Sequence, residues 1–360
     1  MNLARTAKEE EDLTIERRVL EGKRVLVTGG TGSLGKALVR RILSRELGQP
    51  QKVTVFSRDE AKQHEMRLES SRAGSATDEV VYKDFRNVLE FWIGDVRDYD
   101  AVLAAVRRAD VVFHAAALKQ VPSCEYAPIE AVKTNVLGAS NLVRAILSEE
   151  SPVETAIAIS TDKACKPVNV MGMTKAIQER IFVTANLGQT RTKFMCVRYG
   201  NVLSSRGSVV PLFLDQIAKG GPVTITLEQM TRFLLTLDKA VDTVFAALQH
   251  GARGDTYVPK IPAAYVMDIA KALIGSRKIA MKVSGIRPGE KIDEIMVSEE
   301  EVFRTVERGD YYVIKPVLPE LSEAAIDPAR SSEYSSRDVT LDVAAVADLV
   351  MGATQREAAH

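Results

Sequence analysis

An acidic and a basic side chain stand next to each other in Asp162-Lys163, shortly after the apolar run 156–159. A neutral lysine can take a proton from carbon, and a protonated aspartic acid can give one to a departing oxygen. Burial favours the uncharged form of both groups, but an ion pair opposes it, so a net proton exchange between the two is expected. The pair predicts removal of water from a substrate. The alternative is that Asp162 caps a loop and Lys163 is a surface charge.

Three more side chains flank this pair. Thr161 is expected to bond the substrate oxygen at the reacting carbon. Lys175 follows Met171 by four residues, one helical turn, and is expected to bond the ribose of a nicotinamide. A base is also needed to take the proton of a substrate hydroxyl. Met171 cannot serve because methionine does not ionise, so the candidates are Asp162 and a water molecule held by Lys175. Met171 itself is expected to pack in the interior, with a substrate-shaping role as the alternative.

A glycine-rich turn points to a bound dinucleotide. Gly29, Gly32 and Gly35 follow the β-branched run 24–28 and open a helix with apolar residues at helical spacing. Such a turn brings backbone N–H groups and the positive end of the helix dipole to a pyrophosphate. Because the pattern lies in a strand–turn–helix context, it predicts a nicotinamide cofactor site.

The residues after the second strand favour NADP over NAD. In Ser57-Arg58-Asp59, the serine and arginine come before the acid, and Lys62 follows. Arginine accommodates a 2′-phosphate, whereas an acid bonds a free ribose hydroxyl, so NAD with Asp59 on the ribose is the alternative. Asp95 is expected to accept a bond from adenine or to cap a helix. The predicted cofactor contacts are Gly29, Thr31, Gly32, Ser33, Leu34, Gly35, Ser57, Arg58, Lys62, Asp95, Val96, Ala115, Ala116, Ala117, Lys119, Asn135 and Lys175.

The elements that carry these residues alternate between strand and helix. Strands are predicted at 24–28, 53–56, 90–93, 111–113, 156–160 and 194–199, and helices at 135–147 and 173–185. This order predicts an α/β fold of the Rossmann type, with a doubly wound parallel sheet and a smaller C-terminal α/β substrate-binding lobe. We expect an N-terminal extension at 1–21, the cofactor domain at 22–200, the lobe mainly at 201–330 with segments returning to the sheet, and a helical tail at 331–360. A surface loop is expected at 70–78 and a final helix at 338–351.

Composition excludes several classes of protein. Lys plus Arg and Asp plus Glu both number 48, which argues against nucleic-acid or membrane-surface binding. The 3 cysteines form no CxxC pair and the 4 histidines are scattered, so no disulfide framework and no metal site are expected, and the reducing cytoplasm is favoured. No apolar run approaches the ~20 residues that span a bilayer.

Several segments of the chain resemble the extended short-chain dehydrogenase/reductases. They are more closely similar to the UDP-N-acetylglucosamine 4,6-dehydratases that invert C5, and the segment with Cys124 together with Met171 resembles their capsule-type branch. The likeness runs from about residue 23 to residue 319. It is carried by residues 29–35, 56–60, 114–125, 160–175, 198–211, 230–233 and 287–291.

The resemblance implies an internal redox elimination on a nucleotide sugar. Hydride leaves C4 of the sugar, the C5 proton becomes acidic beside the new ketone, water leaves from C6, and the hydride returns to C6. It implies Lys163 as the base at C5 and Asp162 as the acid at the C6 oxygen. It also implies a homo-oligomer, hexamer or dimer.

A second set of residues is expected to hold the substrate. Arg232 lies between apolar residues and is a natural bidentate ligand for phosphate. The backbone at Ser208 and Val209 can offer N–H groups to phosphate, and Glu290 can take ribose hydroxyls. The predicted substrate contacts are Lys119, Met171, Asn201, Ser208, Val209, Arg232, Arg287 and Glu290.

Two other functions stay open. One is an epimerase or dehydratase that acts on another nucleotide sugar, for example a GDP-linked one. The Asp162-Lys163 pair argues against a 4-epimerase, which needs no second acid–base pair. The other is a non-catalytic protein that senses NADP. Met171 suggests it, because the resembled short-chain dehydrogenase/reductases normally carry a tyrosine at that position.

Overall fold

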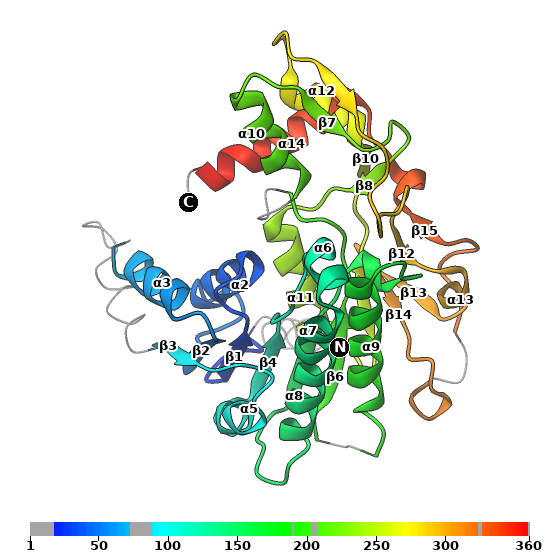
Figure 1. The fold of residues 1–360 in the computed structure, drawn as a ribbon. Coiled ribbons are helices and arrows are strands. Elements are labelled where there is room, and N and C mark those ends of the chain that lie inside the picture. Colours follow the sequence, from blue (N-terminus) through cyan, green and yellow to red (C-terminus); the bar gives the residue numbers. More distant parts are fainter. Residues whose placement is uncertain (1–17, 73–87, 189–190, 204–207, 323–325, 359–360) are drawn as a thin grey trace, which may run out of the picture.

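The computed structural model of the 360-residue chain describes residues 18–72, 88–188, 191–203, 208–322 and 326–358. Its centre is a sheet of nine strands in the order β13-β14-β9-β6-β5-β4-β1-β2-β3 (Figure 1). These are β1 (Arg24–Thr28), β2 (Lys52–Ser57), β3 (Leu89–Ile93), β4 (Val111–His114), β5 (Thr155–Ile159), β6 (Lys193–Val197), β9 (Thr256–Pro259), β13 (Thr305–Arg308) and β14 (Tyr311–Ile314).

The sheet confirms the predicted α/β class. Strands from β3 through β9 are parallel, whereas β14 and β13 add an antiparallel edge. Strand order reverses between β1 and β4, and a crevice at such a reversal is where open parallel sheets bind ligands.

Helices cover both faces of the sheet because its strands are apolar on both sides. In β1, Val25 and Val27 belong to one buried cluster and Leu26 to the other. The first cluster includes α2 (Ser33–Leu43) and α11 (Leu237–His250), and the second includes α5 (Tyr99–Val106), α8 (Gly138–Ile146) and α9 (Val170–Thr184). The remaining helices near this sheet are α3 (Glu60–Arg72), α6 (Val121–Tyr126), α7 (Pro128–Ala131) and the π-helix η1 (Val132–Leu137).

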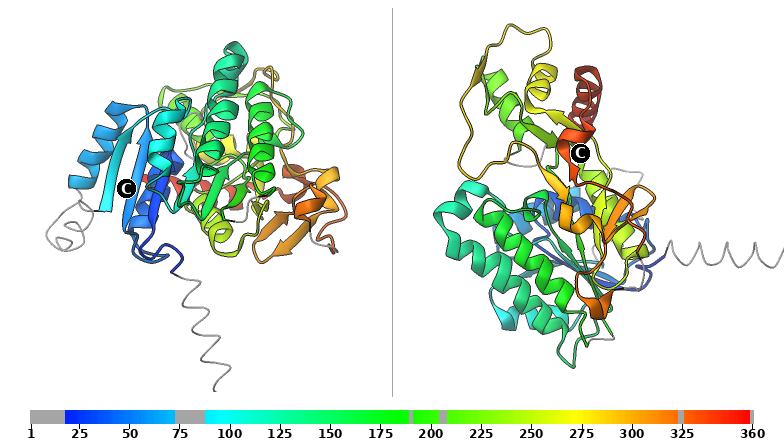
Figure 2. Two further views of the ribbon diagram at one scale, coloured as in Figure 1. Left: turned by 90° about the horizontal axis from the view of Figure 1, so that it is seen from below. Right: turned by 90° about the vertical axis from the view of Figure 1, so that its right-hand side faces the viewer.

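A smaller lobe packs around its own apolar cluster, above the sheet in the right-hand view of Figure 2. It contains α10 (Val209–Ala218), β7 (Val223–Ile225), β8 (Thr231–Phe233), β10 (Ala263–Tyr265), α12 (Val266–Ile274), β11 (Met281–Val283) and α14 (Val343–Ala358). Short elements connect the lobe with the sheet, namely η2 (Asp162–Ala164), β12 (Ile295–Val297), α13 (Glu299–Val302), η3 (Pro319–Leu321), β15 (Tyr334–Ser335) and η4 (Ser336–Val339).

A buried ion network anchors the connecting segment. Arg198, just after β6, donates to both carboxylate oxygens of Glu179 at 3.0 and 2.7 Å and to those of Glu301 at 2.7 and 2.9 Å. It also donates to the carbonyl of Met296 at 2.8 Å. Charge-assisted bonds of this kind fix geometry, so β12 and α13 are held against the sheet.

The structure corrects several element boundaries. The helix expected at 135–147 is a π-helix that passes into α8 at Gly138. The last helix begins at Val343 rather than 338, because Ser335 and Asp338 form a capping box on the separate turn η4. The expected loop at 70–78 is wrong at its start, since α3 continues to Arg72, and 73–78 lie outside the described residues.

Most of the expected N-terminal extension, residues 1–17, also lies outside the described part. Leu20 within it is buried against the first domain. Within the described residues, no helix is both long and apolar enough to cross a membrane.

Candidate active site

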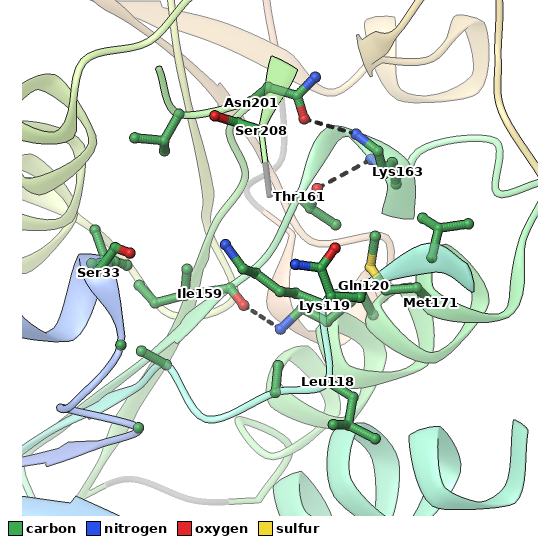
Figure 3. Close-up of a pocket in the computed structure, with 18 of the residues that line it drawn as sticks. Ser33, Leu118, Lys119, Gln120, Ile159, Thr161, Lys163, Met171, Asn201 and Ser208 are labelled. Atoms are coloured by element: carbon green, nitrogen blue, oxygen red, sulfur yellow. Dashed lines mark hydrogen bonds between the residues drawn. The ribbon is translucent and has the colours of Figure 1, made fainter. Parts of the chain in front are cut away.

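A large cavity lies where the ends of the parallel strands meet the lobe. Its volume is about 900 Å³, and both units contribute to its lining. It holds the glycine turn at one end and Lys163 at the other, and Figure 3 shows Lys119, Thr161, Lys163 and Met171 around one open space. All predicted site residues line it except Asn135 and Asp162.

The glycine turn fits a dinucleotide. Gly29 has φ +68°, and a Cβ there would lie 2.6 Å from the backbone nitrogen of Ala116. A Cβ on Gly35 would lie 2.5 Å from the Cα of Gly30. The turn is therefore packed so closely that only glycine fits, and α2 begins at Ser33 with its N-terminus at the cavity.

The segments that follow β2 and β3 line the cavity with charges that already have partners. The carboxylate of Asp59 accepts from the backbone nitrogen of Lys62 at 3.0 Å and also from its ammonium. Asp95 is bound by Arg97 at 2.7 and 2.9 Å, and a guanidinium nitrogen of Arg58 lies 3.6 Å from it. Arg58 keeps about half of its side chain exposed.

Asn135 does not contact the cavity, which corrects the prediction that it binds the cofactor. It is fully buried on η1 and donates to the carbonyl of Leu118 at 3.0 Å and to the hydroxyl of Thr174 at 2.9 Å. It also accepts from the backbone nitrogen of Leu118 at 2.8 Å. Asn135 therefore holds the segment before Lys119, and its role is to position that loop.

Lys163 is bound by three acceptors. Its ammonium lies 3.0 Å from Oδ1 of Asp162, 3.2 Å from Oε1 of Glu294 and 3.1 Å from Oδ1 of Asn201. Asp162 lies beneath the cavity wall with no exposed surface, and the hydroxyl of Thr161 donates to its Oδ1 at 3.0 Å. Asp162 therefore reaches the cavity only through its neighbours. It is neither a loop cap nor a surface group.

Glu294 is a functional candidate that the sequence did not reveal. It precedes β12, far along the chain from Lys163, and it is 1% exposed. Burial lowers the pKa of Lys163, but the carboxylates of Asp162 and Glu294 outweigh this, so the pKa is raised. The charges that this chain supplies therefore do not by themselves produce the depressed pKa that a lysine base needs.

The pKa values of the two carboxylates in this cluster are shifted in opposite directions. Burial raises the pKa of Asp162; the Lys163 ammonium opposes that shift, and the Glu294 carboxylate adds to it. Burial acts to raise the pKa of Glu294 too, but Lys163, Arg232 and Lys291 lower it overall.

Lys175 and Met171 lie one turn apart on α9, as expected. The ammonium of Lys175 donates to the carbonyl of Ile159 at 2.5 Å and to Oε1 of Gln178 at 2.8 Å, which leaves one donor for the cavity. Burial lowers its pKa to about 8. Met171 is 4% exposed and packs against Cys124 and Ala131 while it lines the cavity.

Arg232 lines the cavity and already makes three hydrogen bonds within the protein, and its role as a phosphate ligand stays a prediction. Its Nη1 donates to the carbonyls of Thr231 at 2.7 Å and Ile292 at 3.1 Å, and its Nη2 donates to that of Lys291 at 3.0 Å. Its Nε lies 3.7 Å from Oε1 of Glu294. The guanidinium therefore holds the segment before β12 in place.

The other predicted substrate residues line the cavity at its lobe side. Asn201 uses its amide oxygen on Lys163, so only its NH₂ group remains for a ligand. Ser208 precedes α10, which starts at Val209, and its buried hydroxyl has no partner among the described residues. Lys119, Arg287 and Glu290 complete this part of the lining.

Comparison with known proteins assigns the chain to a family. The sequence pattern of the polysaccharide biosynthesis protein family matches residues 25–316, which include every residue of the cluster around Lys163. The chain belongs to this family. It is a branch of the extended short-chain dehydrogenase/reductases, so the coarse resemblance seen in the sequence is confirmed.

Two named relatives are similar in sequence to this chain over most of its length. A protein named UDP-glucose 4-epimerase from Rickettsia canadensis (strain McKiel) is 43% identical over 297 residues, which cover 81% of this chain and 82% of the relative. A protein of Methanocaldococcus jannaschii named an uncharacterized membrane protein is 42% identical over 309 residues, covering 82% and 86% of the two chains.

Solved structures confirm the fold of this family member. Pen from Bacillus thuringiensis superposes with a TM-score of 0.82 at 32% identity, covering 93% of this chain and 98% of that one. The dTDP-glucose 4,6-dehydratase DesIV from Streptomyces venezuelae has a TM-score of 0.62 at 19% identity, covering 75% and 86% of the chains. At that identity the second likeness shows the fold alone.

Proposed function

We propose that the protein is an NADP-dependent nucleotide-sugar 4,6-dehydratase that converts UDP-N-acetylglucosamine to a UDP-4-keto-6-deoxy-hexulose with inversion at C5. The observation that carries the proposal is the coupling of Lys163, at the cavity wall, to the buried acid Asp162. Removal of water beside a ketone needs both a base and an acid, and this pair supplies them. A 4-epimerase has no use for the second acid–base pair.

The side chains divide the proton transfers between them. Lys163 takes the C5 proton in its neutral form, which the positive ring of a bound cofactor would favour. A proton from solvent is then added to C5 on the opposite face. Asp162 gives a proton through Thr161 to the C6 oxygen, which leaves as water. When bound, the cofactor would accept a hydride from C4 of the sugar and later return it to C6. One proton leaves the C4 hydroxyl and one enters at the C6 oxygen, so the substrate loses only water.

Lys175 is the proposed acceptor of the C4 hydroxyl proton, through a water molecule. Met171 cannot take a proton, whereas the pKa of Lys175 is lowered by burial to about 8. A group with a pKa near the working pH is an efficient proton acceptor. The ammonium also keeps one N–H for the ribose of the cofactor.

NADP is proposed over NAD because of the charges around the predicted ribose site. Lys62 already binds the carboxylate of Asp59, while Arg58 is half exposed at the cavity. Dissociation constants of both cofactors, measured for wild type and Arg58→Ala, test this choice. We expect the substitution to weaken the binding of NADP by about tenfold or more and to leave the binding of NAD unchanged. Equal effects on the two cofactors would contradict it.

A UDP-sugar 4-epimerase is the second candidate, because the relative from Rickettsia canadensis carries that name. Incubation with UDP-N-acetylglucosamine in D₂O, followed by NMR, separates the candidates. A 6-methyl signal with deuterium at C5 is the expected product. A C4 epimer would favour the second candidate. Tightly bound NADP with an unreacted sugar would favour a non-catalytic sensor, and a GDP-linked sugar is the control substrate.

We also propose a cytoplasmic homo-oligomer, either a dimer or a hexamer. The three cysteines are unpaired and buried, as in a reducing compartment. Large apolar side chains are exposed next to one another on α6, α7 and α9, namely Tyr126, Ile129, Met173 and Ile177. Light scattering on the purified protein is expected to give a multiple of the 39.4 kDa chain mass. A monomer would contradict this proposal.

A further inference from the structure

Two carboxylates lie close to one ammonium at the base of the cavity. Lys163 lies between two buried carboxylates, 3.0 Å from Asp162 and 3.2 Å from Glu294. Oδ2 of Asp162 and Oε2 of Glu294 are both buried without a hydrogen-bond partner among the described residues. A buried ionised oxygen without a partner is costly, so a proton held by one of the two carboxylates would lower this cost.

The neighbours of the two acids differ. Oε1 of Glu294 faces two cations, Lys163 at 3.2 Å and Arg232 at 3.7 Å, and Lys291 adds a third positive charge nearby. Among the described residues, Lys163 is the one cation paired with Asp162, and the hydroxyl of Thr161 shares the same carboxylate oxygen. Such a proton is therefore better placed on Asp162 than on Glu294.

We infer that Glu294 is a positioning residue that balances the charge of Lys163 and thereby leaves Asp162 as the group that holds the proton. Three acceptors surround the ammonium of Lys163, which suits its three donors and fixes its direction toward the cavity. The raised pKa of Asp162 and the lowered pKa of Glu294 agree with this assignment. The acid of the dehydration is thus loaded before substrate arrives.

The catalytic meaning of Glu294 rests on the proposed function, whereas the location of the proton can be measured without substrate. Infrared titration of the carboxylic acid band is the measurement, on wild type, Asp162→Asn, Glu294→Gln and the control Glu299→Gln. Glu299 is a suitable control because it is an exposed glutamate on α13. Thermal unfolding and NADP binding check that each variant is folded.

We expect Asp162→Asn to remove a band that persists near neutral pH in wild type. In Glu294→Gln the titration midpoint is expected to fall by about one pH unit or more, because a neighbouring negative charge is gone. Glu299→Gln is expected to keep the wild-type midpoint. Glu294→Asp retains the negative charge, so its titration midpoint is expected to lie close to the wild-type value. This variant also tests the inference if Glu294→Gln does not fold.

Two results would overturn the inference: a wild-type band that survives in Asp162→Asn, or an unchanged midpoint in Glu294→Gln. With active enzyme, the alkaline limb of the pH profile of kcat is expected to move to lower pH in Glu294→Gln. A purely structural role would lower kcat equally at every pH. If wild type has no dehydratase activity but the band responds as expected, the proposed function fails and the inference stands.

Discussion

The ammonium of Lys163 lies 3.2 Å from a carboxylate oxygen of Glu294, although the two residues are far apart in the chain. Lys163 follows β5 of the sheet, whereas Glu294 immediately precedes β12. The contact therefore joins the first domain to the connecting segment of the lobe. Any change in the packing of the lobe is expected to alter the charge balance at Lys163.

Lys163→Ala tests the proposed base. The substitution removes the only group in the cluster that we expect to take the C5 proton, so deuterium exchange at C5 is expected to fall by about 10²- to 10⁴-fold. NADP affinity is expected to stay at the wild-type value, since the cofactor turn is untouched. Lys166→Ala is the matched control, because Lys166 is an outward lysine paired with Glu299 and Glu333. Undiminished exchange in Lys163→Ala would remove the lysine from the reaction.

Gly29→Ala tests the cofactor turn. The new Cβ would collide with the backbone of Ala116, so NADP binding is expected to weaken by at least about tenfold. Gly22→Ala is the control, since Gly22 has a similar φ of +66° but open space around it. Both variants carry the strain of a left-handed backbone, about 1 kcal/mol. Only Gly29→Ala is expected to lose cofactor affinity, as measured by titration calorimetry, and equal affinities would contradict this use of the turn.

The sequence placed most of the predicted cofactor contacts around the cavity, because the signals for them are local. The turn at Gly29 is formed by residues that are close together in the sequence, and the strand–helix alternation around it predicts the parallel sheet. The cluster at Lys163 depends on contacts distant in sequence. Nothing in the spacing of 287–294 indicates that Glu294 contacts Lys163. The spacing also does not indicate that the backbone carbonyls of 291 and 292 accept hydrogen bonds from Arg232.

Lys175 is expected to make stability depend on pH in a defined window. Its pKa is about 8 in the folded protein against 10.5 for a free lysine, so the unfolded chain binds more protons between these values. The free energy of unfolding of wild type, relative to Lys175→Met, is therefore expected to rise as pH increases from about 8 to 10.5. Below pH 8 the difference is expected to be constant. Denaturant unfolding of both proteins at several pH values checks this, and a flat difference throughout would contradict it.

Met171 is expected to act by packing. Met171→Leu conserves volume, so kcat is expected to stay within a few fold and the loss of stability below about 1.5 kcal/mol. Met171→Tyr is the informative partner, since it introduces an ionisable group one turn before Lys175. If wild type is active, the tyrosine is not needed. An inactive wild type that tyrosine rescues would instead favour a non-catalytic, cofactor-sensing protein.

Transfer of hydride within one sugar is the central claim, and a substrate with deuterium at C4 tests it most directly. UDP-N-acetylglucosamine labelled at that carbon is incubated with the protein and excess unlabelled NADP⁺, and the product is examined by NMR and mass spectrometry. The account predicts that the deuterium appears in the C6 methyl group of the same molecule, without dilution by the added cofactor. Deuterium that stays on C4 of an epimer, or that is lost to the cofactor pool, would contradict it.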